Sequence, residues 1–392
     1  MLLDQIKTKN FRNFTELSYF CHPRFNVFLG NNGQGKTSII EAIYFVSTLR
    51  SFRLSKLNSL VKDTETACLV TAKTSTSEGW HSELSVRIER QGDRIKKQAL
   101  INGKPYPSSV QYLSQRFGNA ELGMHSIVFN PADHELVHGE PASRRTYLDR
   151  VLSAESLDYL KALQTYQKFL QQKNFALKAQ FVDSRMIDSL NEGMVGPGAL
   201  IVFERMNWIA SVQEPIASVL SFIAPNQKQT LLEYQTKLFD TQETGLFSGQ
   251  RPIASLKQTE ALFRDKLVDY STEERNARSC IVGPHRDDWR VNLDGSSIKN
   301  IGSQGEVRSF LMALKLAELQ LFREKTGHRP LFLLDDYSSE LDRHRRGFLL
   351  KYLLDSDLQV FLTSTDESVF EELTDSKQVI VVNGQITEKE RL

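Results

Sequence analysis

The stretch of sequence that decides the fold is GNNGQGKT at residues 30–37. It matches the pattern GxxxxGK[ST] of phosphate-binding loops, in which glycines let backbone N–H groups turn toward phosphate oxygens. The apolar run FNVFL at 25–29 precedes it, and apolar residues spaced three and four apart follow it from 36 to about 49. A strand should therefore lead into the loop and a largely buried helix should lead out of it. An ordinary glycine turn is the alternative.

Each part of the loop has an expected role toward a nucleoside triphosphate. Lys36 should place its ammonium between the outer phosphates, and Thr37 should offer its hydroxyl to Mg²⁺. The amino-terminal end of the following helix adds a positive field. The residues expected to bind the nucleotide here are Gly30, Asn31, Asn32, Gly33, Gln34, Gly35, Lys36 and Thr37.

A second expected part of the site is the acidic end of LFLLDD at 331–336. Ligands of open parallel sheets bind beyond the carboxyl ends of the strands, which is where Asp335 and Asp336 stand. Asp335 should hold Mg²⁺, usually through water, and Asp336 should orient or deprotonate the attacking water, as the catalytic residue. An acidic turn that caps the next helix is the alternative. Because 299 positions separate Lys36 from Asp335, a large segment is inserted between the two halves.

The chain of 392 residues is long enough for two or three lobes at roughly 150 residues per domain. Short apolar strands between helices predict an α/β fold with a parallel sheet covered on both faces. We expect an amino-terminal ATPase part over 1–120, a mainly helical lobe over 121–280 and a carboxyl-terminal ATPase part over 281–392. Within the helical lobe, the breaker residues of GMVGPG at 193–198 predict an interruption of the helix.

The charge balance limits how this chain could meet nucleic acid. With 49 basic and 48 acidic residues, the net charge is +1, so no global field draws the protein onto a polyanion. DNA contact would need a local patch that binds phosphates without reading sequence. Solvated faces are the alternative, as is a role of Arg144 and Arg145 in stabilising the helical lobe. The candidate clusters are Arg50, Arg53 and Lys56; Arg87, Arg90, Arg94, Lys96 and Lys97; and Arg144, Arg145 and Arg150.

The cysteines and the apolar content argue for a cytosolic protein. Cys21, Cys68 and Cys280 are odd in number and far apart, which favours a reducing compartment over disulfides or a zinc site. The amino terminus lacks the apolar core of a signal peptide, and no stretch is apolar for the 18 or so residues of a membrane helix.

Three further stretches resemble motifs of a known protein family. They are PADHELVHGEPASRRTYLD at 131–149, GPHRDD at 283–288 and LLDDYSSELD at 333–342. Together with the phosphate loop and NFRNF at 10–14, they closely resemble the RecF family of bacterial recombination mediators over essentially the whole chain. The resemblance implies an ABC-type P-loop ATPase head, SMC-like without the long coiled coil, with an inserted helical lobe. It also implies ATP and Mg²⁺ as cofactors, an ATP-dependent homodimer, sequence-independent binding to gapped duplex DNA, and cooperation with RecR and RecO in directing RecA.

The same resemblance assigns further nucleotide contacts. In SQGE at 303–306, Ser303 and Gly305 would lie in the signature motif, which meets the γ-phosphate of ATP on the opposite subunit. Asp342 would belong to the loop that crosses the dimer interface, and Arg12 would lie near the α-phosphate. The alternatives are a capping box formed by Ser303 and Glu306, a simple helix start at Asp342, and a solvated arginine at position 12.

Departures from the family pattern suit a slow, regulatory ATPase. Asp336 stands where ABC transporters use Glu, FLTSTD at 361–366 offers no switch histidine, and no glutamine marks a metal sensor around 130–133. Ala132, His134 and Glu140 also differ from the residues usual in the family. Two other functions remain open: a non-hydrolysing scaffold that nucleotide organises for a partner, and the nucleotide-binding subunit of a membrane transporter, from whose usual LSGGQ motif SQGE departs.

Overall fold

The computed structural model describes residues 1–53, 57–92, 94–117, 123–224, 228–239, 255–336, 342–367 and 373–388. The chain divides into two compact units, one of Met1–Asp133 with Phe322–Leu392 and the other of His134–Leu321. The sequence suggested boundaries near 120 and 280, whereas the second unit ends within helix α10 (Gln304–Thr326). Residues 281–321, expected in the carboxyl-terminal ATPase part, thus cluster with the helical unit.

The first unit contains the predicted parallel sheet. Its strands lie in the order β15-β14-β3-β13-β12-β8, and every neighbouring pair is parallel except β14 and β15. Every residue of β3, β12 and β13 is buried, so the sheet is covered on both faces as expected. The bounds are β3 (Phe25–Leu29), β8 (Ser126–Phe129), β12 (Leu331–Leu334), β13 (Val360–Ser364), β14 (Ser376–Val382) and β15 (Gln385–Glu388).

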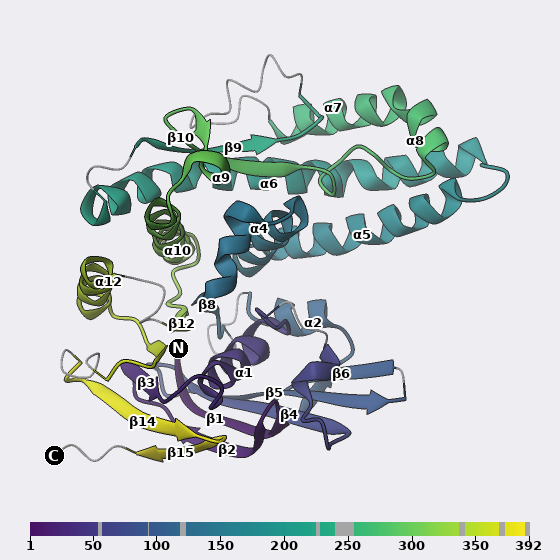
Figure 1. Cartoon of the computed structure of the whole chain (residues 1–392). Helices are drawn as coiled ribbons and strands as arrows, with labels where there is room; N and C mark the ends of the chain where they lie inside the picture. The colour runs from purple at the N-terminus through teal and green to yellow at the C-terminus, as the bar shows by residue number, and fades with distance from the viewer. Residues whose placement is uncertain are drawn as a thin grey trace. The chain divides into compact units, whose positions relative to one another are not determined.

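A second, antiparallel sheet in the same unit has the order β2-β1-β4-β5-β6-β7. Helix α1 (Lys36–Thr48) contacts strands of both sheets and is buried around most of its circumference, which confirms the helix predicted after the phosphate loop (Figure 1). Its apolar residues from Ile39 onward share one core with Phe28 of β3 and with side chains of the second sheet. The strands are β1 (Leu2–Phe11), β2 (Phe14–Phe20), β4 (Ala67–Ser75), β5 (His81–Gln91), β6 (Arg94–Ile101) and β7 (Lys104–Tyr106). Short helices η1 (Leu57–Leu60) and α2 (Ser109–Ser114) and the longer α12 (Arg343–Asp355) complete this unit; η3 (Pro131–His134) runs to its boundary.

The second unit is mainly helical. Helices α5 and α6 lie side by side, and α7 packs on α6 (Figure 1). A small sheet of order β11-β10-β9 accompanies them. The elements are α3 (Glu135–His138), α4 (Pro141–Glu155), α5 (Leu157–Leu177), α6 (Ser184–Ile223), β9 (Thr230–Gln235), α7 (Leu256–Asp269), α8 (Ser271–Ala277), β10 (Asp288–Leu293), β11 (Ser296–Ser297) and α9 (Ile298–Ile301), with most of α10.

The predicted helix break at 193–198 is wrong, because α6 runs through it for 40 residues with Pro197 inside. The glycines permit close packing and do not end the helix. A Cβ on Gly193 would lie 2.5 Å from Cε1 of Phe169, and one on Gly198 would lie 2.3 Å from Cε1 of Phe263. Packing of aromatic rings from α5 and α7 against these positions outweighs the low helix propensity of glycine and proline.

Candidate functional site

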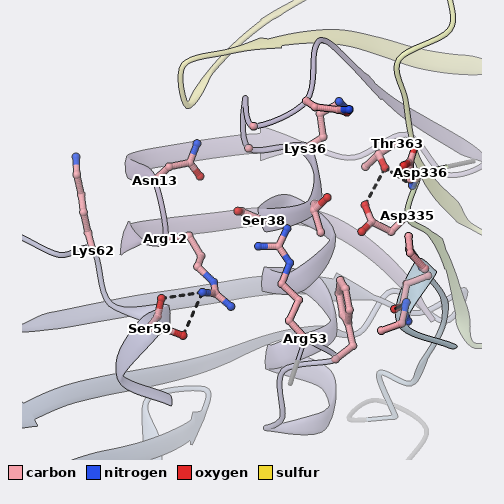
Figure 2. A pocket seen from close by; sticks show the side chains of 18 of the residues that line it. Arg12, Asn13, Lys36, Ser38, Arg53, Ser59, Lys62, Asp335, Asp336 and Thr363 are labelled. Carbon is pink, nitrogen blue, oxygen red and sulfur yellow. Dashed lines mark hydrogen bonds between the residues drawn. The ribbon is translucent and has the colours of Figure 1, made fainter. Parts of the chain in front are cut away.

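A cavity of about 900 Å³ in the first unit brings the phosphate loop and the acidic strand end together. Figure 2 shows Lys36 opposite Asp335 and Asp336, with Arg12 and Asn13 on the far side. Two halves of the site that lie 299 positions apart in sequence therefore meet in space. Ser303, Gly305 and Asp342 are not part of this lining. The cavity is lined by Arg12, Asn13, Asn32, Gly33, Gly35, Lys36, Thr37, Ser38, Phe52, Arg53, Ser59, Val61, Lys62, Asp63, Thr64, Asn130, Pro131, Ala132, Asp335, Asp336 and Thr363.

The backbone of the phosphate loop requires glycine at two positions. Gly30 has φ +145° and Gly35 has φ +113°, a region that residues with a side chain rarely adopt. A Cβ on Gly30 would lie 2.4 Å from the carbonyl oxygen of Val381, and one on Gly35 would lie 2.5 Å from Nδ2 of Asn13. The loop is therefore held closely between the β1–β2 turn and strand β14.

Three groups that sequence reasoning missed fix the loop through Gln34. The Nδ2 of Asn13 donates to the Gln34 carbonyl at 3.1 Å, and the backbone N–H of Gly384 donates to the same oxygen at 3.1 Å. The backbone N–H of Asn383 donates to the Gln34 side-chain oxygen at 2.6 Å. The Asn-Gly pair at 383–384 is a common hairpin-turn signal, but nothing in it indicates contact with a loop 350 positions away.

The Lys36 ammonium already lies within the curve of the loop. It donates to the carbonyl oxygens of Gly30 at 2.6 Å and Asn31 at 2.9 Å. Burial lowers the pKa of Lys36, while the carboxylates of Asp336 and Asp335 act in the opposite direction. These contacts pre-position a cation at the place where phosphate oxygens would enter.

Thr363, on β13, fixes both carboxylate residues. Its hydroxyl donates to Oδ1 of Asp335 at 2.9 Å and accepts from the backbone N–H of Asp336 at 2.8 Å (Figure 2). Burial raises the pKa of Asp335, and hydrogen bonds from Thr37 and Thr363 oppose that rise. Asp336 has φ +59°, so the chain turns sharply where the second carboxylate leaves the strand. The threonine at the end of β13 is a contact that the sequence analysis did not single out.

The hydroxyl and carboxylate oxygens beside the phosphate loop are suited to bind a Mg²⁺ ion that enters together with a nucleotide. Within the described part of the chain, no group of three or more His, Cys, Asp or Glu side chains is placed to hold a metal. Nucleotide-bound Mg²⁺ needs only one or two protein ligands, because phosphates and waters complete its shell. The Thr37 hydroxyl and the Asp335 carboxylate, which both line the cavity, would supply such a pair.

Arg12 is a fixed residue of the cavity wall, and it is not a solvated side chain. Its guanidinium forms two hydrogen bonds to the carboxylate of Glu41 on α1, at 2.7 and 2.6 Å, and Glu41 is fully buried. Its remaining nitrogen donates to the carbonyl and the hydroxyl of Ser59, at 3.0 and 3.1 Å. Arg12 therefore joins the helix of the phosphate loop to η1.

The capping box predicted at Ser303 is confirmed. The Ser303 hydroxyl accepts from the backbone N–H of Glu306 at 3.2 Å, and the Glu306 carboxylate accepts from the backbone N–H of Ser303 at 2.8 Å. These hydrogen bonds lower the pKa of Glu306. Ser303 is exposed. A contact of Ser303 or Gly305 with the nucleotide of a second copy stays a prediction.

Asp342 caps a helix, which is the plainer of its two expected roles. Its carboxylate accepts from the backbone N–H of Arg345 at 2.9 Å, and its side chain is 52% exposed. Burial of the carboxylate is slight, and the hydrogen bond from the Arg345 backbone holds its pKa below the ordinary value. Residues 337–341, which include most of the expected interface loop, lie outside the described residues.

The third basic cluster stabilises the helical unit. Arg144 is buried and forms two hydrogen bonds to Asp288, at 2.7 and 2.8 Å. Arg145 donates to the carbonyl of Asp287 at 2.9 Å, and Arg150 lies 3.3 Å from Glu318. The motifs at 131–149 and 283–288 therefore bind each other.

The other two basic clusters are divided between inward and exposed side chains. Arg90 and Lys97 donate to backbone carbonyls, Lys97 to that of Leu49 at the end of α1 at 3.0 Å. Lys56 lies outside the described residues. The exposed members are Arg50, Arg87, Arg94 and Lys96.

In the part of the chain that the structure describes, none of the helices is long and apolar enough to cross a membrane.

Known proteins similar to this chain belong to one family of ATPase heads. A family model described as RecF/RecN/SMC N terminal domain matches residues 2–388. A protein of Citrifermentans bemidjiense named DNA replication and repair protein RecF is 31% identical over 388 residues, which cover 98% of this chain and 100% of that protein.

Two solved structures are similar to the fold. A structure of the recombination mediator protein RecF-ATP in the RecFOR pathway has a TM-score of 0.85 at 26% identity, covering 99% of this chain and 98% of that one. The Smc head domain of Pyrococcus furiosus, bound to the C-terminal domain of ScpA, has a TM-score of 0.56 at 13% identity, covering 99% and 96%. The second likeness concerns the fold alone. Together with the family match, these structures confirm the expected α/β ATPase head of the SMC-like class.

Proposed function

Because the chain belongs to the RecF/RecN/SMC N-terminal domain family, we propose that it is an ATP-dependent DNA-binding protein of recombinational repair and replication. In this proposal it acts in the cytoplasm, dimerises on ATP and binds gapped duplex DNA. With RecR and RecO it helps to place RecA on that DNA. The RecFOR pathway in the description of the ATP-containing neighbour supports this set of partners.

The observation that carries the proposal is the meeting of the phosphate loop and the acid pair in one cavity. On ATP binding, the Lys36 ammonium exchanges its carbonyl partners at Gly30 and Asn31 for phosphate oxygens. Thr37 and Asp335 would hold Mg²⁺, which would neutralise charge on the phosphates when bound. Asp336 orients the attacking water and accepts its proton, and the shorter reach of an aspartate there suits slow turnover.

A second copy would complete the site. Ser303 and Asp342 line no part of the cavity of their own chain, and both are exposed. A helix start bearing a serine and backbone N–H groups is suited to bind the γ-phosphate held by another copy. Dimerisation would also double the phosphate contacts to DNA, which suits a chain whose net charge is only +1.

Two substitutions test the enzymatic part of the proposal. Lys36→Met removes the phosphate-binding ammonium and should abolish ATP binding. Asp336→Asn keeps the fold and nucleotide affinity but should slow single-turnover cleavage at least about a hundredfold, because general-base catalysis supplies an acceleration of that order. Filter binding of radiolabelled ATP and quenched-flow hydrolysis measure the two quantities. Full cleavage by Asp336→Asn would remove it from the mechanism.

The scaffold alternative makes a different prediction for the unaltered protein. A scaffold would bind ATP without cleaving it, whether or not duplex DNA is present. Single-turnover cleavage with and without duplex therefore separates the two functions. The Asp336 carboxylate at the cavity wall favours the ATPase.

A further inference from the structure

The end of the cavity farthest from the acid pair is formed by residues 58–65, which comprise the last part of η1 and the link from it to β4 and are called the connection below. Ser59, Val61, Lys62, Asp63 and Thr64 all belong to the lining. Figure 2 shows Ser59 and Lys62 on the side of the cavity opposite the acidic residues. This connection has no strand ladder of its own, apart from an isolated bridge between Phe11 and Val61, so other groups must satisfy its backbone carbonyls.

Arg90, on β5, satisfies four of these carbonyls. Its Nη2 donates to Asn58 at 2.8 Å and to Val61 at 2.9 Å. Its Nη1 donates to Glu65 at 3.1 Å and, more weakly, to Asp63 at 3.4 Å. A planar guanidinium presents several donors in fixed directions, so one side chain can determine the path of the whole connection.

Arg12 holds the same connection from the cavity side. Its guanidinium donates to the Ser59 carbonyl at 3.0 Å and its backbone N–H to the Leu60 carbonyl at 2.8 Å. The Lys62 carbonyl accepts from Glu65 at 2.9 Å. Every carbonyl from 58 to 63 therefore has a partner, and the two arginines provide most of them. Arg90 does not line the cavity itself. It can affect the shape of the cavity only through the backbone to which it is hydrogen-bonded.

The nucleoside end of a bound triphosphate should lie against this connection. The acid pair and Thr37 fix the metal-bearing phosphates at one end of the cavity, so the base and ribose extend toward the other. We propose that Arg90 is a positioning residue for nucleoside recognition: it holds residues 58–65 in the conformation that contacts the base and ribose. This inference rests on the proposed ATP binding and adds the group that shapes the nucleoside end.

Competition by two ligands tests the inference, because only one of them has a nucleoside. ATP and inorganic tripolyphosphate are each titrated against a fluorescent ATP analogue, with Mg²⁺ present. For Arg90→Ala we expect ATP affinity to fall about tenfold or more, the equivalent of one or two charge-assisted hydrogen bonds, while tripolyphosphate affinity stays within about twofold of the unaltered protein. Lys73→Ala, which removes an exposed cation from the neighbouring strand β4, is the matched control and should change neither.

A conservative variant keeps the test valid if Arg90→Ala does not fold. Arg90→Lys retains the charge but cannot reach carbonyls on both sides, so it should lose part of the ATP affinity and none of the tripolyphosphate affinity. An ATP affinity equal to that of Lys73→Ala overturns the inference, as does an equal loss for both ligands. If the unaltered protein binds no ATP, the proposed function itself fails, which is a different result.

Discussion

Arg205 shows how one buried cation organises the helical unit. It is 2% exposed and donates to Asp149 at 2.7 Å and to the carbonyl of Pro284 at 2.8 Å. Tyr234, which accepts from Arg205 at 3.4 Å, donates in turn to Asp287 at 2.8 Å. The motifs at 131–149 and 283–288 are therefore joined through a residue of α6.

Removal of Arg205 should be costly because it leaves carboxylates buried without their cation. Arg205→Met is expected to lower the free energy of unfolding by about 3–5 kcal/mol. Arg264→Met is the control, since Arg264 forms a solvent-exposed pair with Glu192 that should contribute little to stability. Urea denaturation followed by circular dichroism measures both. Equal effects of the two substitutions would show that the buried network does not stabilise this unit.

The raised pKa of Asp335 predicts how nucleotide binding depends on pH. Because burial favours the neutral acid, Asp335 should take up its proton at a higher pH than an ordinary aspartate. The Mg²⁺-dependent part of ATP affinity should therefore disappear as the pH falls through that raised pKa. Thr363→Val removes a hydrogen bond that favours the carboxylate, so it should move this loss to still higher pH.

ATP titrations with and without Mg²⁺ over a range of pH measure the shift. Thr71→Val is the control, because it also removes a threonine hydroxyl but at a position of β4 that does not line the cavity. It should leave the midpoint unchanged. A midpoint for Thr363→Val at or below that of the unaltered protein would contradict the assignment of Asp335.

At the scale of elements, α6 gives a sharp test of why its glycines are there. Gly193→Ala places a Cβ against the ring of Phe169 and should destabilise the protein by about 1–3 kcal/mol. Gly196→Ala lies three residues along the same helix, where a Cβ meets nothing within 4 Å, and should stabilise it by up to about 1 kcal/mol. Thermal unfolding measures both. Stabilisation by both substitutions would show that the ring contact is not tight.

The elements around the phosphate loop could be predicted because their signals are local. An apolar run, a glycine-rich loop and apolar residues at helical spacing are adjacent in the chain. The observed bounds of β3 and α1 agree closely with those predicted from these patterns. The continuity of α6 could not be predicted, since it depends on rings from α5 and α7 that the sequence near 193–198 does not contain.

Those parts of the site that have a local sequence pattern could also be predicted. The loop and the acid pair carry recognisable patterns, and the parallel sheet brings them to one edge. From the sequence, by contrast, Arg90 and Lys97 were expected to belong to a basic surface. Their partners are backbone carbonyls, which every residue possesses, so no side-chain pattern could indicate that these two cations point inward.

For the molecule as a whole, the proposed dimer means that a second copy completes the nucleotide site. Ser303 serves two purposes in this account: it caps α10, and it presents that helix start to the γ-phosphate held by the other copy. The two can be separated by substitution. Ser303→Asp keeps an efficient cap but sets a negative charge against the phosphate, whereas Ser303→Ala loses about 1 kcal/mol of capping.

Analytical ultracentrifugation with a non-hydrolysable ATP analogue, with and without duplex DNA, measures this dimerisation. The unaltered protein should sediment as a monomer without the analogue and as a dimer with it, and duplex should strengthen the dimer. Ser303→Asp should remain folded and monomeric under every condition. A protein that stays monomeric with the analogue, or a Ser303→Asp variant that dimerises as readily as the unaltered chain, would contradict the proposed dimer.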